Sequence, residues 1–169
     1  MSLIVEDGTI VAGAESFVTV AAANTYHSNR GNATWATITT AQAEEALRRA
    51  TDYMEQMYRN RWKGFRVSSS QALSWPRADV ELEDGPYRNT VATDIVPTEV
   101  KNACSEYALR AAAGELAADL EQAVVSEGVG PMRVEYDRGS PEWVRYRALD
   151  ATLALYLKGS SSMAKLVRS

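Results

Sequence analysis

Apolar residues recur at three- and four-residue spacing along the segment from Thr40 to about Trp62, which is the pattern of an amphipathic helix. Thr39 or Thr40 is placed to cap its first turn, and Gly64 is placed to end it. The pattern predicts a helix of about six turns. Its buried stripe is expected to contain Ala43, Ala46, Leu47, Ala50, Tyr53, Met54, Met57 and Tyr58.

A second helical pattern covers residues 97–122, with Pro97 suited to the first helical position. Its stripe is rich in alanine, which predicts close packing against another helix, and Gly114 marks a contact or a weak point within it. A last helix is expected to start at Ser140 and Pro141 and to stop at Gly159. Near the N-terminus, residues 16–20 read as a short strand, and residues 21–31 as a short helix ending at Gly31.

The segments between these patterns differ in kind. Residues 64–96 show turn chemistry without clear periodicity, which predicts a long irregular loop of functional or partner-binding character. Residues 124–136 change to a strand-like pattern around two glycines and predict a small β-hairpin with Gly128 and Gly130 in its turn. The fold class is therefore mainly α: a single domain over residues 1–159, built as a bundle of three to four helices, followed by an extended C-terminal arm over residues 160–169.

Composition narrows the classes of partner. The chain has 169 residues and a formal net charge of −4, so any nucleic-acid contact must come from a local basic patch. Cys104 is the only cysteine, which excludes an intrachain disulfide. The first residues are acidic where a signal peptide needs positive charge, and the apolar runs are far short of a membrane span. We expect a product of the cytosol with no membrane partner.

The sequence offers no catalytic set, and we expect neither enzyme activity nor a bound cofactor or metal. His27 is the only histidine and is expected at the surface or at a helix end. Cys104 lies on the apolar stripe of the second long helix, where a buried small side chain is favoured over a nucleophile. The acids of residues 79–85 do not have the spacing of a calcium loop and are expected to form a solvated loop or a docking surface for a basic partner.

One stretch, "RWKGFRVSSSQALSWPR" (residues 61–77), combines four basic and three aromatic residues and contains no acid. Two interpretations remain open from its composition. In the first interpretation, the stretch forms a groove in which cations hold phosphates and aromatic rings stack on the bases of a single strand. Alternatively, Trp62, Phe65 and Trp75 pack the loop onto the helical body. The candidate residues for a subunit interface or a DNA-facing lumen are Arg61, Trp62, Lys63, Arg66, Trp75 and Arg77.

The C-terminal arm has a serine-rich start followed by "MAKLVRS". It is either a frayed end or a segment that inserts into a partner. In the second case its partner-binding residues are Met163, Lys165, Leu166, Val167 and Arg168.

The pieces "RWKG", "SQALSWPR", "DIVPTEVKNAC" and "VGPMRVEY" occur in this order in the chain. In this the chain resembles, over roughly residues 5–157, a family of bacteriophage proteins that are often labelled DnaT-like single-stranded-DNA-binding proteins. Genes of this family lie among tailed-phage morphogenesis genes. The expected helices, loop and arm are also similar to those of head–tail connector proteins (adaptor or head-completion proteins), which bind beneath the portal as a dodecameric ring.

The resemblance implies two functions. The first is a structural virion protein of the phage neck, assembled in the host bacterial cytoplasm. It would join the portal protein to the tail or to a second connector protein and help retain packaged DNA. In that role the chain associates with itself in the ring, and DNA passes through the lumen without specific binding, which an acidic body suits. The alternative is a DnaT-like single-stranded-DNA-binding protein. The residues favour the first function, because they supply a helical body, a long loop and an arm but no basic surface.

Overall fold

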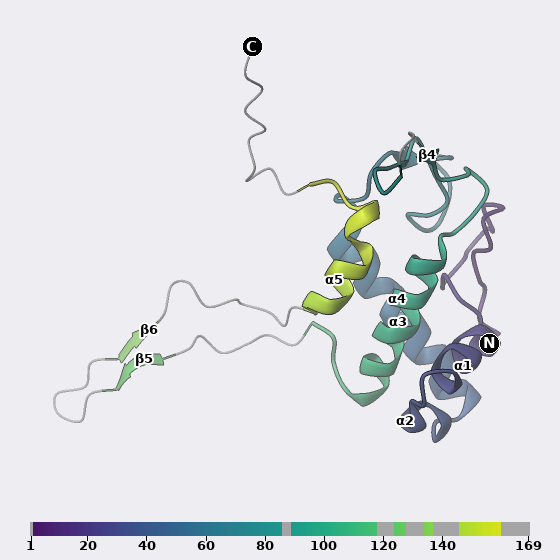
Figure 1. Ribbon diagram of the computed structural model, residues 1–169. Helices are drawn as coiled ribbons and strands as arrows, with labels where there is room; N and C mark the ends of the chain where they lie inside the picture. The colour runs from purple at the N-terminus through teal and green to yellow at the C-terminus, as the bar shows by residue number, and fades with distance from the viewer. Residues whose placement is uncertain (1, 86–88, 118–123, 128–133, 137–145, 160–169) are drawn as a thin grey trace, which may run out of the picture.

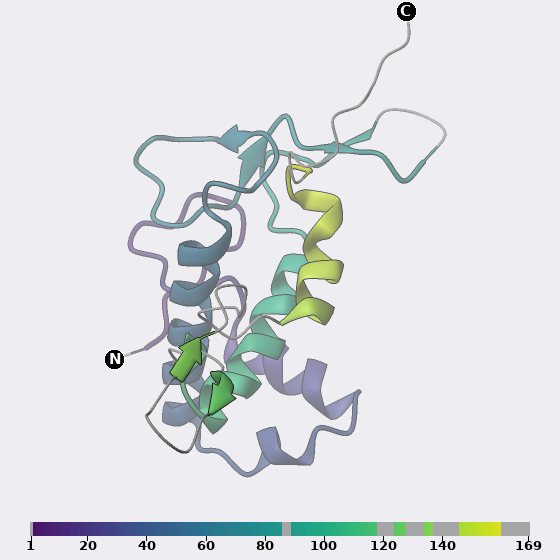
Figure 2. The same cartoon turned by 90° about the vertical axis from the view of Figure 1, so that its left-hand side faces the viewer.

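The structure, a computed structural model, describes residues 2–85, 89–117, 124–127, 134–136 and 146–159. Its described part is mainly helical, as predicted. Helices α3 (Thr40–Tyr58) and α4 (Thr98–Ala113) lie side by side, and α5 (Arg147–Leu153) packs on α4 and continues into the short 3₁₀ helix η1 (Ala154–Tyr156). Helices α1 (Val20–Ser28) and α2 (Ala33–Ala36) lie at one end of this body, and the loop that carries β1 to β4 lies at the other (Figures 1 and 2).

Helix α3 confirms the prediction from the apolar spacing, and its start has a full capping box. The Thr39 hydroxyl accepts from the Gln42 backbone N–H at 3.3 Å, and the Gln42 side chain accepts from the Thr39 backbone N–H at 2.9 Å. The expected stripe is buried except for Met57, which is half-buried. The helix ends at Tyr58, one turn earlier than predicted, because the chain then turns so that Trp62 forms an antiparallel bridge with Leu157.

Gly64 follows this turn, and its position requires glycine. Its φ is +60°, and a Cβ built there would lie 2.0 Å from the Ala78 carbonyl oxygen. The tight approach allows β1 (Phe65–Arg66) to pair antiparallel with β2 (Arg77–Ala78). The loop of residues 64–96 therefore contains more regular structure than expected, because β3 (Glu81–Leu82) also pairs with β4 (Asn89–Thr90).

Helix α4 is shorter than the predicted span of residues 97–122. Pro97 is its N-cap rather than its first residue, and the helix ends at Ala113. Gly114 adopts an extended backbone and stops the helix, so it acts as a terminator rather than as a contact within a longer helix. The small side chains of the two central helices, among them Ala46, Ala50 and Ala103, are fully buried and let α3 and α4 approach closely.

The N-terminal segment corrects two expectations. Ser16 forms an isolated bridge with Val5, but residues 16–20 do not form a strand, because Thr19 caps α1 through the Ala22 N–H and the helix begins at Val20. The expected helix over residues 21–31 is confirmed as α1, although it ends at Ser28. His27 lies near the helix end as predicted, but it is buried rather than at the surface, with 1% of its area exposed.

The predicted hairpin is confirmed as an antiparallel pair of β5 (Val124–Glu127) and β6 (Val134–Tyr136), and its expected turn glycines lie outside the described residues. The last helix was predicted to run from Pro141, but Tyr146 has a non-helical backbone and α5 begins at Arg147. Ser140 and Pro141 lie outside the described residues, as does the whole arm of residues 160–169. No helix within the described ranges is long and apolar enough to cross a membrane.

Tyrosine hydroxyl groups tie the last helical segment to the body. The Tyr58 hydroxyl donates to the Asp150 carboxylate at 2.6 Å and lies 2.6 Å from the Tyr107 hydroxyl. The Tyr156 hydroxyl donates to Glu99, also at 2.6 Å. Burial is the main cause that raises the pKa of all three tyrosines, so they stay protonated and able to donate.

Candidate functional site

The two tryptophans of the basic-aromatic segment (residues 61–77) are fully buried. Trp62 and Trp75 have no exposed area, and their rings meet edge to face with centroids 5.6 Å apart. Trp75 also contacts the ring of Tyr156 at 5.8 Å in the same geometry. The prediction that these two residues pack the loop onto the helical body is confirmed. A buried indole cannot stack on a base unless the loop first detaches.

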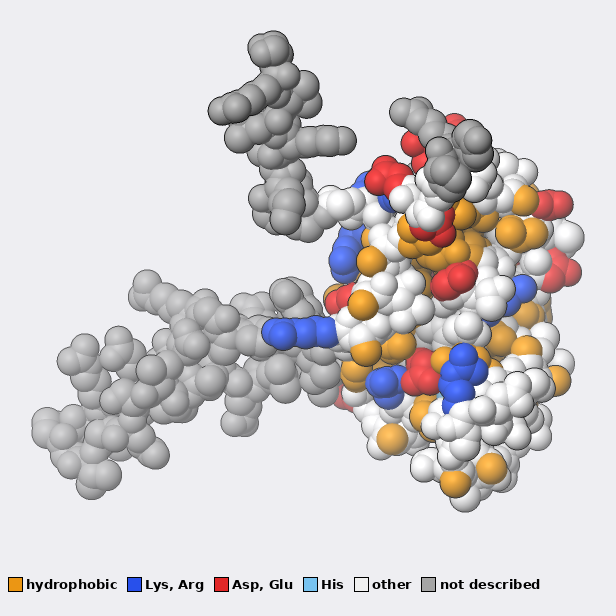
Figure 3. All heavy atoms as spheres, viewed as in Figure 1, with side chains coloured by type: hydrophobic (Ala, Val, Ile, Leu, Met, Phe, Trp, Pro, Cys, Tyr) orange, Lys and Arg blue, Asp and Glu red, His pale blue; other side chains and the backbone are white. Residues whose placement is uncertain are grey.

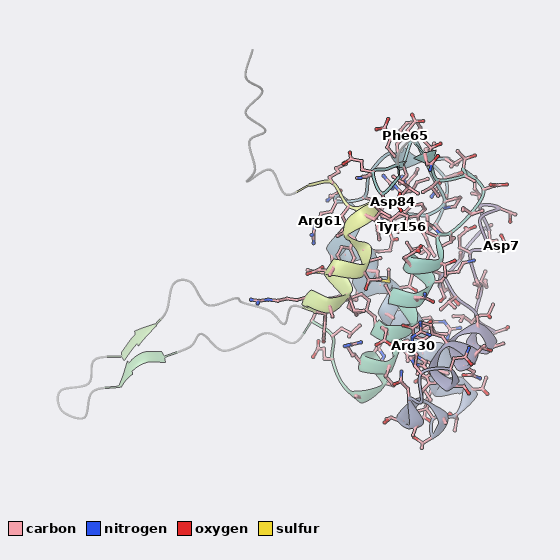
Figure 4. The ribbon with its side chains drawn as sticks, viewed as in Figure 1. Asp7, Arg30, Arg61, Phe65, Asp84 and Tyr156 are labelled. Carbon is pink, nitrogen blue, oxygen red and sulfur yellow. The ribbon has the colours of Figure 1, made fainter. Side chains whose placement is uncertain are left out.

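Phe65 does not share this role, so that part of the packing prediction is wrong. Its side chain is 57% exposed, and Figure 4 shows it at the end of the molecule that carries the loop. The physical reason is the pairing of β1 with β2: in a two-stranded ladder, alternate side chains point to opposite faces, and the core edge is already occupied by Trp62 and Trp75. Val67, two residues along, is likewise exposed.

Arg77 is the innermost cation of the segment, with 5% of its area exposed. Its guanidinium donates to three backbone carbonyl oxygens: Lys63 at 2.7 Å, Gly64 at 2.8 Å and Ser74 at 3.1 Å. Burial is the main cause that lowers its pKa. Arg77 thus joins the two ends of the loop from the inside and is not available to a phosphate.

Further polar residues that no sequence pattern indicated also hold this loop in place. Glu55, on the polar face of α3, accepts from the Ser74 N–H at 2.8 Å and from the Ser74 hydroxyl at 2.7 Å. The side chain of Gln71 donates to the carbonyl oxygens of Leu73 and Pro76 and accepts from the Ser68 N–H. The motif "SQALSWPR" is therefore a structural motif: Gln71, Ser74, Trp75 and Arg77 are all buried and fix the loop to α3. In the sequence, the only indication of this motif was the run of turn-forming residues around Trp75.

The other three cations of the segment lie closer to solvent. Arg61 is exposed, with its guanidinium 5.3 Å from the centre of the Tyr58 ring. Lys63 and Arg66 are half-buried, and each donates to a carbonyl oxygen at 3.1 Å, of Glu81 and Gln71 respectively. Figure 4 shows Arg61 and Phe65 on different sides of the loop end, and Figure 3 shows acidic and apolar side chains mixed on this face rather than a basic stripe.

The structure therefore does not bring the six candidates of residues 61–77 together into a groove. Three of them (Trp62, Trp75 and Arg77) are interior, two hold backbone carbonyls, and Arg61 alone is exposed. The five candidates of the C-terminal arm, from Met163 to Arg168, lie outside the described residues. Over the described part of the chain there is no group of three or more His, Cys, Asp or Glu residues placed to hold a metal ion.

Cys104 is buried with no exposed area, as predicted from its place on the apolar stripe of α4. Burial is the main cause that raises the pKa of its thiol. Both properties oppose a role as a nucleophile, which needs an accessible thiolate.

Searches for a curated relative and for a similar solved structure returned no match. A family model does match, and it spans residues 1–169. The chain belongs to the family described as "Putative DnaT-like ssDNA binding protein".

Proposed function

We propose that the chain is a structural subunit of a tailed-phage neck, an adaptor that joins the portal protein to the tail or to a second connector protein. The observation that carries this proposal is the burial of Trp62, Trp75 and Arg77. The residues that best matched a single-strand groove in the sequence instead fix a long loop to the helical body. A rigid helical block with a fixed loop suits a ring subunit, which must present the same surface to each neighbour.

The charge balance supports the same proposal. The chain carries 22 acidic and 18 basic residues, so it does not attract phosphate as a whole. The cations of residues 61–77 are mostly engaged by backbone carbonyls, which leaves few for a salt-dependent DNA contact. A ring of such subunits would let DNA pass through its lumen without retaining it by charge.

Assembly on a portal tests the proposal. Purified chain is mixed with purified portal rings at micromolar concentrations, and the mixture is sedimented and imaged by negative stain. We expect a co-sedimenting complex with an added ring of density, and a chain that alone remains monomeric or weakly associated. Clean separation of the chain from the portal would overturn the neck assignment.

Binding of single-stranded DNA is the second candidate function, and the family's description favours it. Among the residues predicted for that role, the exposed side chains are Arg61 and the aromatic Phe65. Titration of labelled oligo-dT at two salt concentrations measures this function directly. If it holds, Arg61→Gln lowers the affinity and reduces its salt dependence, whereas Arg49→Gln, an exposed arginine on α3, changes neither.

A further inference from the structure

The surface formed by α1 and α2 is almost free of charged side chains. Residues 16–43 contain one charged residue, Arg30, in a chain of which 24% is charged. The deficit reaches the solvent, because small or uncharged residues such as Ala22, Asn24 and Ala36 hold exposed positions there. Figure 3 shows this end, the lowest part of the molecule in that view, as apolar and uncharged polar side chains. The centres of protein–protein interfaces are depleted of charge in the same way.

A hollow opens in this surface between α1 and α2. Its volume is about 480 Å³, and the apolar part of its described lining includes Ala33, Ala36 and Ile38. The described side chains that line it are uncharged, and the Arg30 guanidinium lies outside it, 3.6 Å above the centre of the Tyr26 ring. A charged group that entered the hollow would lose water without gaining a counter-ion. The hollow therefore selects an uncharged side chain, and its volume is enough for one large apolar side chain.

The opposite end of the body presents such a side chain. Phe65 has the greatest exposure of the large apolar residues within the described ranges, at 57%, and Val67, two residues along, is 41% exposed. Figure 4 shows Phe65 at the end of the molecule that carries the loop, away from α1 and α2. One chain thus has a protruding aromatic side chain at one end and an uncharged hollow at the other.

The backbone that carries Phe65 is fixed before any partner binds. The carbonyl oxygen of Gly64 accepts from the buried Arg77 guanidinium at 2.8 Å, and Phe65 pairs with Ala78 across the β1–β2 ladder. A side chain that is already held in place loses less conformational entropy when it binds. Phe65 is therefore presented as a preorganised contact.

We infer that Phe65 of one copy of the chain inserts into the hollow between α1 and α2 of a second copy. Because the two surfaces differ and lie at opposite ends of the body, the contact is head to tail (Figures 1 and 2). Each copy gives its Phe65 and receives another, and contacts of this kind continue into a closed ring or an open chain. The inference rests on the proposed function, for which it names the contact between neighbouring subunits of the ring.

The area of this contact determines how strongly two isolated copies associate. An aromatic side chain buries about 150–250 Å². Even with Val67 added, the buried area stays far below the roughly 800 Å² per partner of a stable interface. A single contact therefore leaves the dilute chain monomeric, whereas each subunit of a closed ring is held from two sides. This is the behaviour of a chain that assembles on a template.

Disulfide trapping tests the inference without the portal. Val67→Cys keeps Phe65 in place, and it is mixed at high protein concentration with Ser28→Cys or with Ala33→Cys, on the two sides of the hollow. The native Cys104 is buried and does not compete. After oxidation, we expect a disulfide-linked dimer on a non-reducing gel from at least one mixture, and none from any of the three variants alone. Ile95→Cys, at another exposed apolar position, is the control for Val67→Cys and should form no dimer.

Further changes show whether Phe65 and the hollow carry the contact. Phe65→Ser in the Val67→Cys chain, or Ala36→Trp in its partner, should lower the yield of dimer by about tenfold or more, whereas Ala151→Trp, at an exposed position on α5, leaves the yield unchanged. Circular dichroism confirms that each variant is folded.

Three results would overturn the inference. The first is no dimer from either mixture, which leaves the hollow to a partner other than this chain. The second is a dimer of Val67→Cys with itself in equal yield, which identifies a symmetric contact instead. The third is a dimer that Phe65→Ser does not reduce. A portal complex without trapping refutes this inference alone, and trapping without a portal complex refutes the neck assignment alone.

Discussion

Replacing Trp75 by alanine is expected to destabilise the fold rather than to remove a DNA contact. The side chain has no exposed area and contacts the rings of Trp62 and Tyr156. Truncating a fully buried tryptophan costs about 3–5 kcal/mol of the free energy of unfolding. For a chain of this size, that loss lowers Tm by about 10 °C.

Trp75→Phe is the matched variant that separates volume from hydrogen bonding. The Trp75 indole N–H is buried and has no hydrogen-bond partner among the described residues, which is itself costly. Phenylalanine keeps an aromatic ring in place and removes this N–H, so part of the lost packing is offset. We expect Trp75→Phe to lower the free energy of unfolding by only about 1 kcal/mol.

Urea denaturation followed by far-ultraviolet circular dichroism measures both variants, because that signal reports the helices and not the tryptophan being changed. Oligo-dT binding is measured in parallel at a temperature where each variant is folded. The reasoning is refuted if Trp75→Ala unfolds at the same urea concentration as the unmodified chain. It is also refuted if that variant stays fully stable but loses oligo-dT binding, which would mean that the ring stacks on a base.

Three further outcomes are expected. Burial lowers the pKa of His27 below its usual value near 6.5, so the unfolded chain binds the proton more readily than the folded chain. The contribution of His27 to the free energy of unfolding is therefore full above about pH 6.5 and falls as the pH drops below it. Denaturation curves at pH 7.5 and 5.5 measure this dependence, and a His27→Gln variant should lose it. Gly64→Ala should cost about 2–3 kcal/mol in urea denaturation, because its φ is +60° and the new Cβ would meet the Ala78 carbonyl oxygen, whereas Gly159→Ala, where a Cβ meets nothing within 4 Å, should be neutral. Deleting residues 160–169 should leave Tm nearly unchanged and prevent co-sedimentation with the portal; a deletion variant that still complements an amber mutant would show that the arm is a frayed end.

The central helices could be predicted from the sequence because their signals are local. The spacing of apolar residues placed α3 and its buried stripe, and it also placed Cys104 in the core. The capping of α3 at Thr39 follows from the residues of its first turn alone. The strand-like pattern on both sides of two glycines predicted the β5–β6 pair for the same reason, since a hairpin is formed by neighbours in the chain.

The candidate site was decided by contacts between distant parts of the chain. Trp62, Phe65 and Trp75 look alike in the sequence, yet two are buried and one is exposed, because the partners that bury Trp75 include Tyr156, about eighty residues away. His27 was expected at the surface or at a helix end, but it is buried, and its Nε2 lies 3.0 Å from the Ser105 carbonyl oxygen on α4. A local pattern reports which residues share a face of one element, but burial depends on which other element covers that face, and only the packed structure supplies that partner.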